Sequence, residues 1–422
     1  MSPTRTLTHE GEEIPRAVRR IVDETPILDI HTHLFPPTFG DMLLWGIDEL
    51  LTYHYLVAEF LRVTDIPYDE FWSLPKSVQA ERIWQTLFIE RSPVSEATRG
   101  VVTVLAQLGL PLVDRNLNAY REWFAKRSLD FHTKEVWEKA NVRKAIMTND
   151  PFDPVERTFW EKNTPVDKRF WAALRIDPLL NNWPQAAQYL ASLGYAVKVT
   201  LEDPTLAELQ RFLAEWLDRM QAKYAAISLP PDFEYPGAPV TSTLLEKALL
   251  PVLRDRNLPL ALMIGVKRGV NPQLRLAGDG VGTADVSTVE RLCAAFPGNK
   301  FMVTMLAREN QHALCVAARK FRNLLVFGCW WFLNNPRLIL EMTQMRLEML
   351  GTSVVLQHSD ARVLEQLIYK WAHFRSILAM VLQEKYAYLA SLGWDVHEEE
   401  MRRDIRAVLG GYFEDFLELR LP

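Results

Sequence analysis

Short apolar runs rich in β-branched residues alternate along the chain with longer segments in which apolar residues recur at helical spacing. Residues 244–252 and 286–296 show that helical spacing clearly. Strands that alternate with helices predict parallel βα units. The candidate strands are residues 27–31, 144–148, 171–176, 225–229, 259–265, 301–306, 324–328 and 353–357. Eight units are the number in a closed (β/α)8 barrel, so we expect an α/β fold of the TIM-barrel type.

One long segment, residues 35–143, interrupts the repeat between the first two strands. Its apolar residues favour helices, and a connection of this length is usually functional. We therefore predict a helical insertion, or lid subdomain, over a barrel formed by residues 1–34 and 144–422. A smaller insertion, residues 181–219, is expected to hold a hairpin near residues 196–200. After the eighth strand, C-terminal helices are expected.

Composition and charge argue against two classes of partner. The chain has 422 residues, a net charge of -5 and 48% hydrophobic residues, which is typical of a globular protein. It has no strongly basic stripe, so we expect no nucleic-acid partner. The longest strongly apolar stretch, residues 324–333, is far shorter than a membrane span, so we expect no membrane partner.

Cysteine usage and the N-terminal segment suggest a compartment. Cys293, Cys315 and Cys329 form no close pair and are expected to be buried free thiols, as in a reducing compartment. The N-terminal segment around His9 and Glu10 has no apolar core of an export signal. We therefore expect a cytoplasmic protein.

The strongest chemical signal is His31-Thr32-His33 at the end of the first predicted strand. Side chains two apart on a strand point to the same side, so both imidazoles face one space. Imidazole is the commonest protein ligand for zinc-like metals. The pair thus suggests a metal site, although two surface or capping histidines would give the same motif.

Asp360, at the end of the eighth predicted strand, is the simplest third ligand. The first and last strands are neighbours in a closed barrel, and active sites lie at the C-terminal ends of the strands. Two imidazoles and one carboxylate would leave positions open for water or substrate. Alternatively, Asp360 caps the helix expected near Val363 or pairs with Arg362.

Other strand ends suggest an anionic, ring-shaped ligand. Arg175, Arg308 and Arg362 each carry a planar guanidinium that matches a carboxylate or phosphate, although each could instead pair with a neighbouring acid. Trp330 and Trp331 could stack on a sugar ring or simply pack after an apolar strand. The expected ligand is thus a small anionic molecule.

Several segments occur in an order that is typical of one enzyme family. They are Asp29-Ile30-His31-Thr32-His33-Leu34, His54-Tyr55, Thr148-Asn149-Asp150-Pro151-Phe152-Asp153, Arg175-Ile176-Asp177, Phe327-Gly328-Cys329-Trp330-Trp331-Phe332, Ser359-Asp360-Ala361-Arg362 and His373-Phe374-Arg375-Ser376-Ile377-Leu378. By these segments the chain resembles the uronate isomerases, (β/α)8 enzymes of the amidohydrolase superfamily. The resemblance extends from the first strand to about residue 389.

The resemblance implies interconversion of an aldose uronate, glucuronate or galacturonate, and its 2-ketose through a cis-enediol. It implies that His31, His33 and Asp360 hold one divalent metal ion, for which zinc is expected. A small sugar acid is the implied partner, in carbohydrate metabolism such as glucuronate catabolism. Large barrels often associate, so a homo-oligomer is a further expectation, by analogy alone.

The resemblance also implies roles for residues around the metal. Asp360, or a water on the metal, would carry the proton. Arg362, with Arg175, would bind the uronate carboxylate. His54 and Tyr55 would cover the substrate and bond to its hydroxyls. Arg308 and Trp331 are added as substrate contacts from their places at strand ends.

Two departures from the family pattern stand out. Met263 occupies the position of the family's strand-5 histidine, and residues 228–232 lack the histidine that follows strand 4. The loss of two imidazoles argues against a binuclear hydrolase, which needs more ligands. A sugar-acid isomerase is the first interpretation. The others are a different mononuclear enzyme of the superfamily, such as a lactonase or decarboxylase, and a non-catalytic sugar-acid-binding paralogue.

Overall fold

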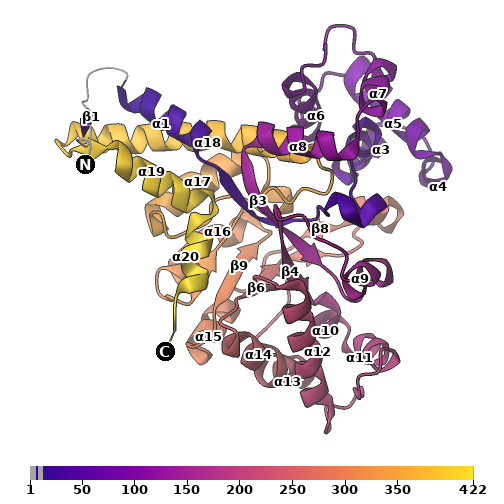
Figure 1. Ribbon diagram of the computed structural model, residues 1–422, viewed down its shortest axis with the longest axis vertical. Helices are drawn as coiled ribbons and strands as arrows, with labels where there is room; N and C mark the ends of the chain where they lie inside the picture. The colour runs from indigo at the N-terminus through magenta and orange to yellow at the C-terminus, as the bar shows by residue number, and fades with distance from the viewer. Residues whose placement is uncertain (1–5, 8–12, 422) are drawn as a thin grey trace.

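The computed structural model describes residues 6–7 and 13–421; residues 1–5, 8–12 and 422 are not described, so His9 and Glu10 lie outside the described part. At the centre is a parallel sheet of seven strands that curls around a core (Figure 1). In spatial order the strands are β2 (Ile27–Thr32), β3 (Val142–Asn149), β4 (Phe170–Arg175), β5 (Ala225–Leu229), β6 (Leu260–Ile264), β9 (Phe301–Met305) and β10 (Leu324–Val326). These are the first seven predicted strands, within one or two residues at most ends.

The eighth predicted strand, residues 353–357, is an extended segment with a single bridge between Val355 and Phe327. It still closes the ring. The Gly328 N–H donates to the Val355 carbonyl (2.8 Å), and the Asp360 N–H donates to the carbonyl of His31 in β2 (3.2 Å). Positive φ angles at Gly328 (64°) and Asp360 (55°) turn the chain out of a regular ladder. The barrel class is therefore confirmed, with an irregular eighth segment.

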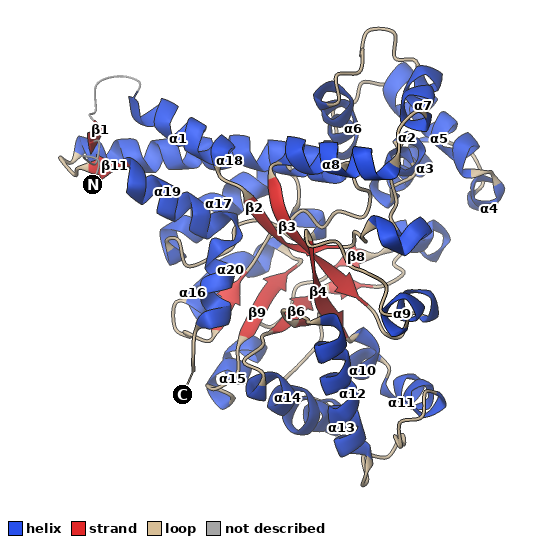
Figure 2. Ribbon diagram, viewed as in Figure 1, coloured by secondary structure: helices blue, strands red, loops and turns tan. Residues whose placement is uncertain are grey.

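Helices surround the sheet (Figure 2). Outside the insertion they are α1 (Glu13–Glu24), α9 (Pro154–Glu161), α10 (Asp177–Asn181), α11 (Trp183–Ser192), α12 (Thr205–Met220), α13 (Pro239–Leu244), η3 (Leu245–Leu249), α14 (Leu250–Asp255), α15 (Ser287–Ala295), η5 (Arg308–Asn310), α16 (Gln311–Ala318), η6 (Trp331–Leu333), α17 (Pro336–Leu350), α18 (Gln366–Ser391), α19 (Glu398–Arg406), η7 (Ala407–Gly411) and α20 (Tyr412–Glu418). In α12, for example, Leu209, Phe212 and Trp216 are buried at helical spacing, which fixes the face that packs on the barrel.

Helices also fill the segment between β2 and β3, and most of them gather at the upper right of Figure 1. They are η1 (Pro37–Met42), α2 (Ile47–Leu51), α3 (His54–Val63), α4 (Tyr68–Ser73), α5 (Lys76–Trp84), η2 (Gln85–Glu90), α6 (Glu96–Gln107), α7 (Leu117–Ala125) and α8 (Leu129–Ala140). Whether residues 35–143 behave as a separate lid subdomain stays a prediction.

The loop after β6 lies against these helices. It contains β7 (Val266–Lys267), η4 (Pro272–Gly278) and β8 (Gly280–Val281). The indole N–H of Trp72 donates to the carbonyl of Gln273 in this loop (2.8 Å), and the Arg275 guanidinium lies 4.5 Å from the Trp72 ring centroid. The insertion and the loop thus approach the barrel mouth together.

Two smaller predictions have opposite outcomes. The prediction of a hairpin near residues 196–200 is wrong, because no strand forms there. The N–H groups of Ala196 and Lys198 donate to the side chains of Glu208 and Thr205 instead of to a partner strand. The three cysteines are free and buried, as expected.

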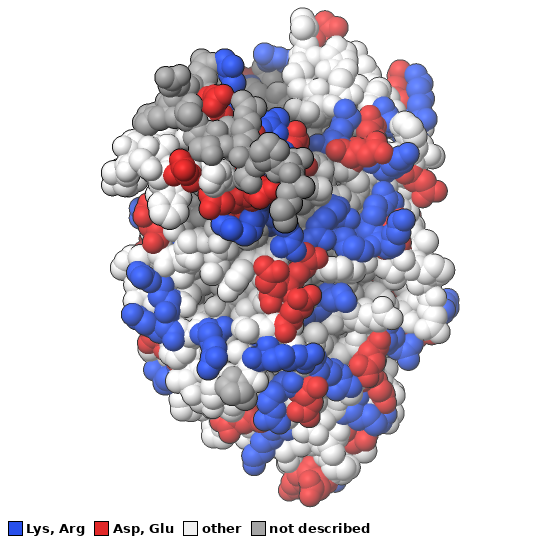
Figure 3. Space-filling view, turned by 60° about the vertical axis from the view of Figure 1, so that its left-hand side comes forward, with Lys and Arg blue, Asp and Glu red and all other residues white. Residues whose placement is uncertain are grey.

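The face seen in Figure 3 carries side chains of both charge signs, which are interspersed across it. A short two-stranded sheet pairs β1 (Thr6–Leu7) with β11 (Val396–His397). Within the described residues, no helix has the length and apolar character needed to cross a membrane.

Candidate active site

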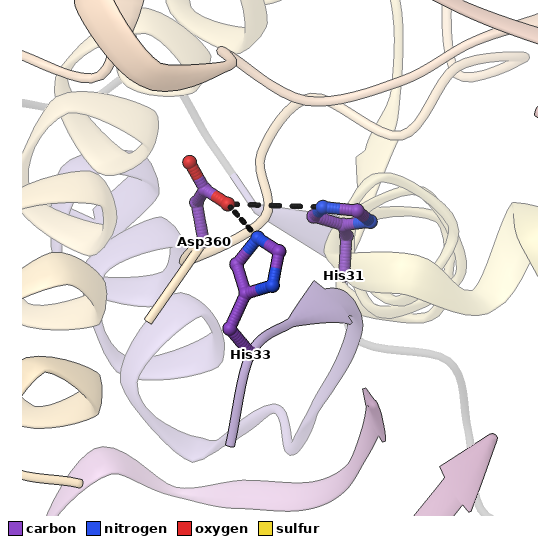
Figure 4. Close-up of side chains that lie close together, drawn as sticks. All are labelled: His31, His33 and Asp360. Atoms are coloured by element: carbon purple, nitrogen blue, oxygen red, sulfur yellow. Dashed lines mark ion pairs between the residues drawn. The ribbon is translucent and has the colours of Figure 1, made fainter. Parts of the chain in front are cut away.

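The three predicted metal ligands meet at the C-terminal end of the barrel strands (Figure 4). His31 and His33 project from the end of β2, and the irregular eighth segment brings Asp360 to them. Oδ1 of Asp360 lies 3.7 Å from Nε2 of His31 and 3.3 Å from Nε2 of His33. One ligand atom from each residue lies within 4.8 Å of the others, a spacing that suits a shared cation.

Hydrogen bonds determine which nitrogen of each imidazole is free. The Tyr224 hydroxyl donates to the Ile30 carbonyl (2.8 Å) and lies 3.2 Å from Nδ1 of His31. Because its only hydrogen is donated to that carbonyl, the hydroxyl can only accept a hydrogen bond from Nδ1–H of His31. Thr148 does the same for His33: its hydroxyl donates to a backbone carbonyl and lies 2.9 Å from Nδ1. Both Nε2 lone pairs therefore face Asp360, as metal ligation requires.

Electrostatics agree with a metal site. Burial lowers the pKa of His31 to about 3, although Asp360 opposes the shift, and burial also holds the pKa of His33 well below its usual value. Both imidazoles are thus neutral near pH 7. Oδ1 of Asp360 is buried and accepts no hydrogen bond from any described residue. A carboxylate oxygen facing two nitrogen lone pairs is repulsive without a cation between them, so the donor set fits a divalent metal ion.

A cavity of about 200 Å³ opens from these ligands. Its walls include most of the predicted site residues and several others: His31, His33, Tyr53, His54, Thr148, Arg175, Asp177, Ala226, Ser228, Met263, Arg268, Leu276, Asp279, Trp330, Trp331, Asp360 and Arg362. The structure therefore brings His54, Arg175, Trp331 and Arg362 together with the metal ligands, although these segments lie far apart in the sequence.

The two arginines of the cavity differ in their partners. Nε and one terminal nitrogen of Arg175 donate to Oδ2 of Asp177 (2.9 and 2.6 Å), whose other oxygen accepts from the Ser228 N–H. The Arg362 guanidinium forms no ion pair with any described carboxylate, and the alternative pairing with Asp360 is absent. Arg362 thus leaves one positive charge for an anionic group in the cavity.

His54 and Tyr55 begin helix α3 at the cavity edge. Burial lowers the pKa of His54 to about 3, and its buried Nε2 has no hydrogen-bond partner among the described residues. That nitrogen is available for a ligand. Tyr55 is not a wall residue; its ring packs edge-on against His54, 4.6 Å between centroids. The structure therefore places His54 at the cavity wall and Tyr55 behind it.

Arg308 does not reach the cavity. It lies in η5, and its guanidinium, about half exposed, forms an ion pair with Glu341 of α17 (2.9 Å). The strand-end argument predicted its position along the chain but not the outward direction of its side chain. Trp331 does line the cavity, with its ring centroid 5.8 Å from that of His54.

Sequence reasoning missed several residues at the site. Tyr224 orients His31, and Tyr53 lines the cavity beside His54. Arg268 and Asp279 also line the cavity and form an ion pair (2.5 Å) across the β7–β8 loop. Period-2 spacing with Ala226 and Ser228, both wall residues, is a signal that could have identified Tyr224.

Comparison with solved structures places the chain among known proteins. A uronate isomerase from Bacillus halodurans is 52% identical over 96% of each chain, with a TM-score of 0.95. The chain belongs to the uronate isomerase family. A uronate isomerase from Thermotoga maritima (17% identity, 97% of this chain and 99% of that chain, TM-score 0.76) and a glucuronate isomerase from Caulobacter crescentus (16%, 99% and 98%, 0.76) share its fold.

The relationship to the uronate isomerases confirms the predicted resemblance, the barrel fold and the class of a uronate isomerase-like enzyme. A scan against protein-family models gives no match. A search of curated proteins gives none either.

Proposed function

We propose that this chain is a metal-dependent aldose–ketose isomerase that acts on a hexuronate or a related sugar acid. The observation that supports this most strongly is the meeting of His31, His33 and Asp360 in the cavity of a chain that is 52% identical to a uronate isomerase. Zinc is our candidate for the metal, because two neutral imidazoles and a carboxylate are ligands that it accepts.

The proposed reaction moves one hydrogen from C2 to C1 of the open-chain sugar and one from the C2 oxygen to the C1 oxygen. When bound, the metal supplies a Lewis acid that polarises the oxygen at C1 or C2. Oδ1 of Asp360 faces the two histidines, which leaves Oδ2 to take the C2 proton and return it at C1. This transfer passes through a cis-enediol and leaves the carboxylate unchanged overall.

The remaining wall residues hold the substrate in our proposal. Arg362 lacks a carboxylate partner within the described residues and so binds the uronate carboxylate, with Arg175 beside it. The free Nε2 of neutral His54 exchanges a hydrogen bond, or a proton, with a sugar hydroxyl. Trp331 covers one face of the sugar, and Tyr55 supports His54 from behind.

Solvent-deuterium incorporation tests the proposal. Purified protein is incubated in D2O with glucuronate or galacturonate, and ketose formation and deuterium at C1 and C2 are followed by NMR. We expect both, and we expect a chelator or His31→Ala to abolish both together with bound metal. Lactone opening or CO2 release would instead identify another metal enzyme of the superfamily. Tight binding of a sugar acid without turnover, unaffected by a chelator, would identify a binding protein.

The remaining expectations belong to the same proposal. We propose a cytoplasmic enzyme of carbohydrate metabolism such as glucuronate catabolism, with a small sugar acid as its partner. We propose no nucleic-acid or membrane partner, and we propose a homo-oligomer by analogy with other large barrels.

A further inference from the structure

A buried ammonium joins the helical insertion to the barrel behind the cavity. Lys370 of α18 is 5% exposed, and its Nζ donates to Oε1 of Glu96 in α6 (2.6 Å) and to the carbonyl of Asn334 (3.3 Å). Lys370 is not a wall residue of the cavity. A buried ion pair contributes little net stability compared with an apolar replacement, so a role other than stability has to be sought.

On the insertion side, the pair leads to the helix that begins with His54 and Tyr55. Glu96 is the first residue of α6, and the preceding residue, Ser95, donates from its hydroxyl to Glu59 of α3 (2.7 Å). Nζ of Lys370 also lies 5.7 Å from the ring centroid of Tyr55. The ammonium therefore reaches α3 both through α6 and through the ring that supports His54.

On the barrel side, the same ammonium reaches the segment that carries Asp360. Asn334, which accepts from Lys370, donates from Nδ2 to the carbonyls of His358 (3.4 Å) and Ser359 (3.1 Å). Asn334 also directly follows η6, which contains the cavity residue Trp331. The Lys370 side chain thus contacts residues that connect to α3 on one side of the cavity and to the segment of Asp360 on the other.

We infer that Lys370 is a positioning residue for the proposed isomerisation, and this inference rests on the proposed function. Through Glu96 it sets where His54 and Tyr55 lie relative to Asp360, without touching the substrate. Because an error of about 1 Å in the placement of reacting groups can cost on the order of 100-fold in rate, loss of the link is expected to lower kcat.

The test compares two lysines of the same helix. Lys370→Met removes the buried ammonium, and Lys385→Met removes a partly exposed ammonium that pairs with Glu348. We expect Lys370→Met to lower kcat about 10- to 100-fold with a much smaller change in KM, and to keep its bound metal and far-UV circular dichroism. Lys385→Met should leave kcat and KM unchanged. Glu96→Gln should behave like Lys370→Met, and Lys370→Arg, which keeps the charge, should recover part of the rate.

Amide hydrogen exchange tests the link between Lys370 and α3 without a measurement of turnover. We expect faster exchange in α3 of the Lys370→Met protein than in α3 of the Lys385→Met protein. An unchanged kcat and unchanged exchange in Lys370→Met would overturn the inference, as would a rate loss that matches lost metal. Absence of isomerisation by the unaltered protein would overturn the proposed function instead, and exchange in α3 would still report whether Lys370 positions that helix.

Discussion

The hydroxyl of Tyr224 accepts a hydrogen bond from Nδ1 of His31 and thereby keeps the Nε2 lone pair directed at Asp360. Loss of such an outer partner typically costs about 10- to 100-fold in metal affinity. We therefore predict that Tyr224→Phe weakens metal binding by that factor, because His31 can then rotate or change tautomer. Competition with a chromogenic chelator measures the change.

Tyr120→Phe is the matched control, because Tyr120 is also buried and donates to a backbone carbonyl, that of Pro111 (2.7 Å), within the insertion. Both variants lose a hydroxyl whose carbonyl partner is left unpaired, which costs about 1–3 kcal/mol of stability. Only Tyr224→Phe should lose metal affinity. Equal metal affinity in the two variants would show that the tautomer of His31 does not depend on Tyr224.

The second prediction concerns the packing of Gly328 on His358. A Cβ at Gly328 would lie 1.7 Å from Cδ2 of His358, and the residue has a φ of +64°. Gly351 has a similar φ of +59°, but a Cβ there would meet nothing within 4 Å. Both alanine variants carry a backbone cost of about 1–3 kcal/mol. We predict that Gly328→Ala loses about 1–3 kcal/mol more, because His358 must move.

Urea unfolding of the two glycine variants gives the comparison directly. Displacement of His358 should also disturb the neighbouring Asp360, so Gly328→Ala is expected to bind metal more weakly than Gly351→Ala. Equal unfolding free energies of the two variants would contradict this prediction. They would mean that the eighth segment shifts to accommodate the new methyl group without loss of stability, although His358 is buried.

The sequence predicts the strands well because most of their residues are apolar and buried. β5, for instance, spans the predicted residues 225–229, and its residues lie in the core or on the cavity wall. The eighth segment shows where this reasoning fails. Val354, Val355 and Leu356 are buried as an apolar run predicts, but turns at neighbouring residues prevent a regular ladder. Burial follows from composition, whereas pairing depends on backbone geometry that the pattern does not encode.

For the candidate site, too, the sequence predicts which segments meet but not the local geometry. Spacing along the chain predicts that His31, His33 and Asp360 meet, because a closed barrel makes the first and last strands neighbours. It does not predict the direction of a side chain after a strand, and so it includes Arg308, which faces Glu341 outside the cavity. It also misses Tyr224, whose role depends on a hydrogen bond across the barrel.

The third prediction separates two arginines that the sequence treats alike. Arg362 lines the cavity and forms no ion pair with a described carboxylate, whereas Arg308 pairs with Glu341. A hydrogen bond to a charged group contributes about 1.5–3 kcal/mol, so Arg362→Met should raise KM for the uronate about 10- to 100-fold. Arg308→Met should leave KM unchanged. Steady-state kinetics on both variants decide the point, and a shift in KM for Arg308→Met alone would reverse the assignment.

The last prediction concerns the pH dependence of stability. Burial raises the pKa of Glu156 from 4.5 to about 7, although Asn149, Asp150 and Trp160 all donate to this carboxylate and oppose the shift. Between those two values the folded chain holds a proton that the unfolded chain has lost, so the free energy of unfolding falls as the pH rises. The loss from this residue is about 3 kcal/mol between pH 4.5 and pH 7. Burial also raises the pKa of Asp29 to about 6, in the same direction, so the contribution of Glu156 has to be isolated by substitution.

The variant Glu156→Gln has no titrating group at this position. Its amide can replace only part of the acceptor set, which changes the stability by an amount that is independent of pH. Urea unfolding of both proteins at pH 5 and pH 8 should therefore show a smaller decline for the variant. Parallel declines would mean that Glu156 is already ionised in the folded chain at pH 5 and that its three donors outweigh its burial.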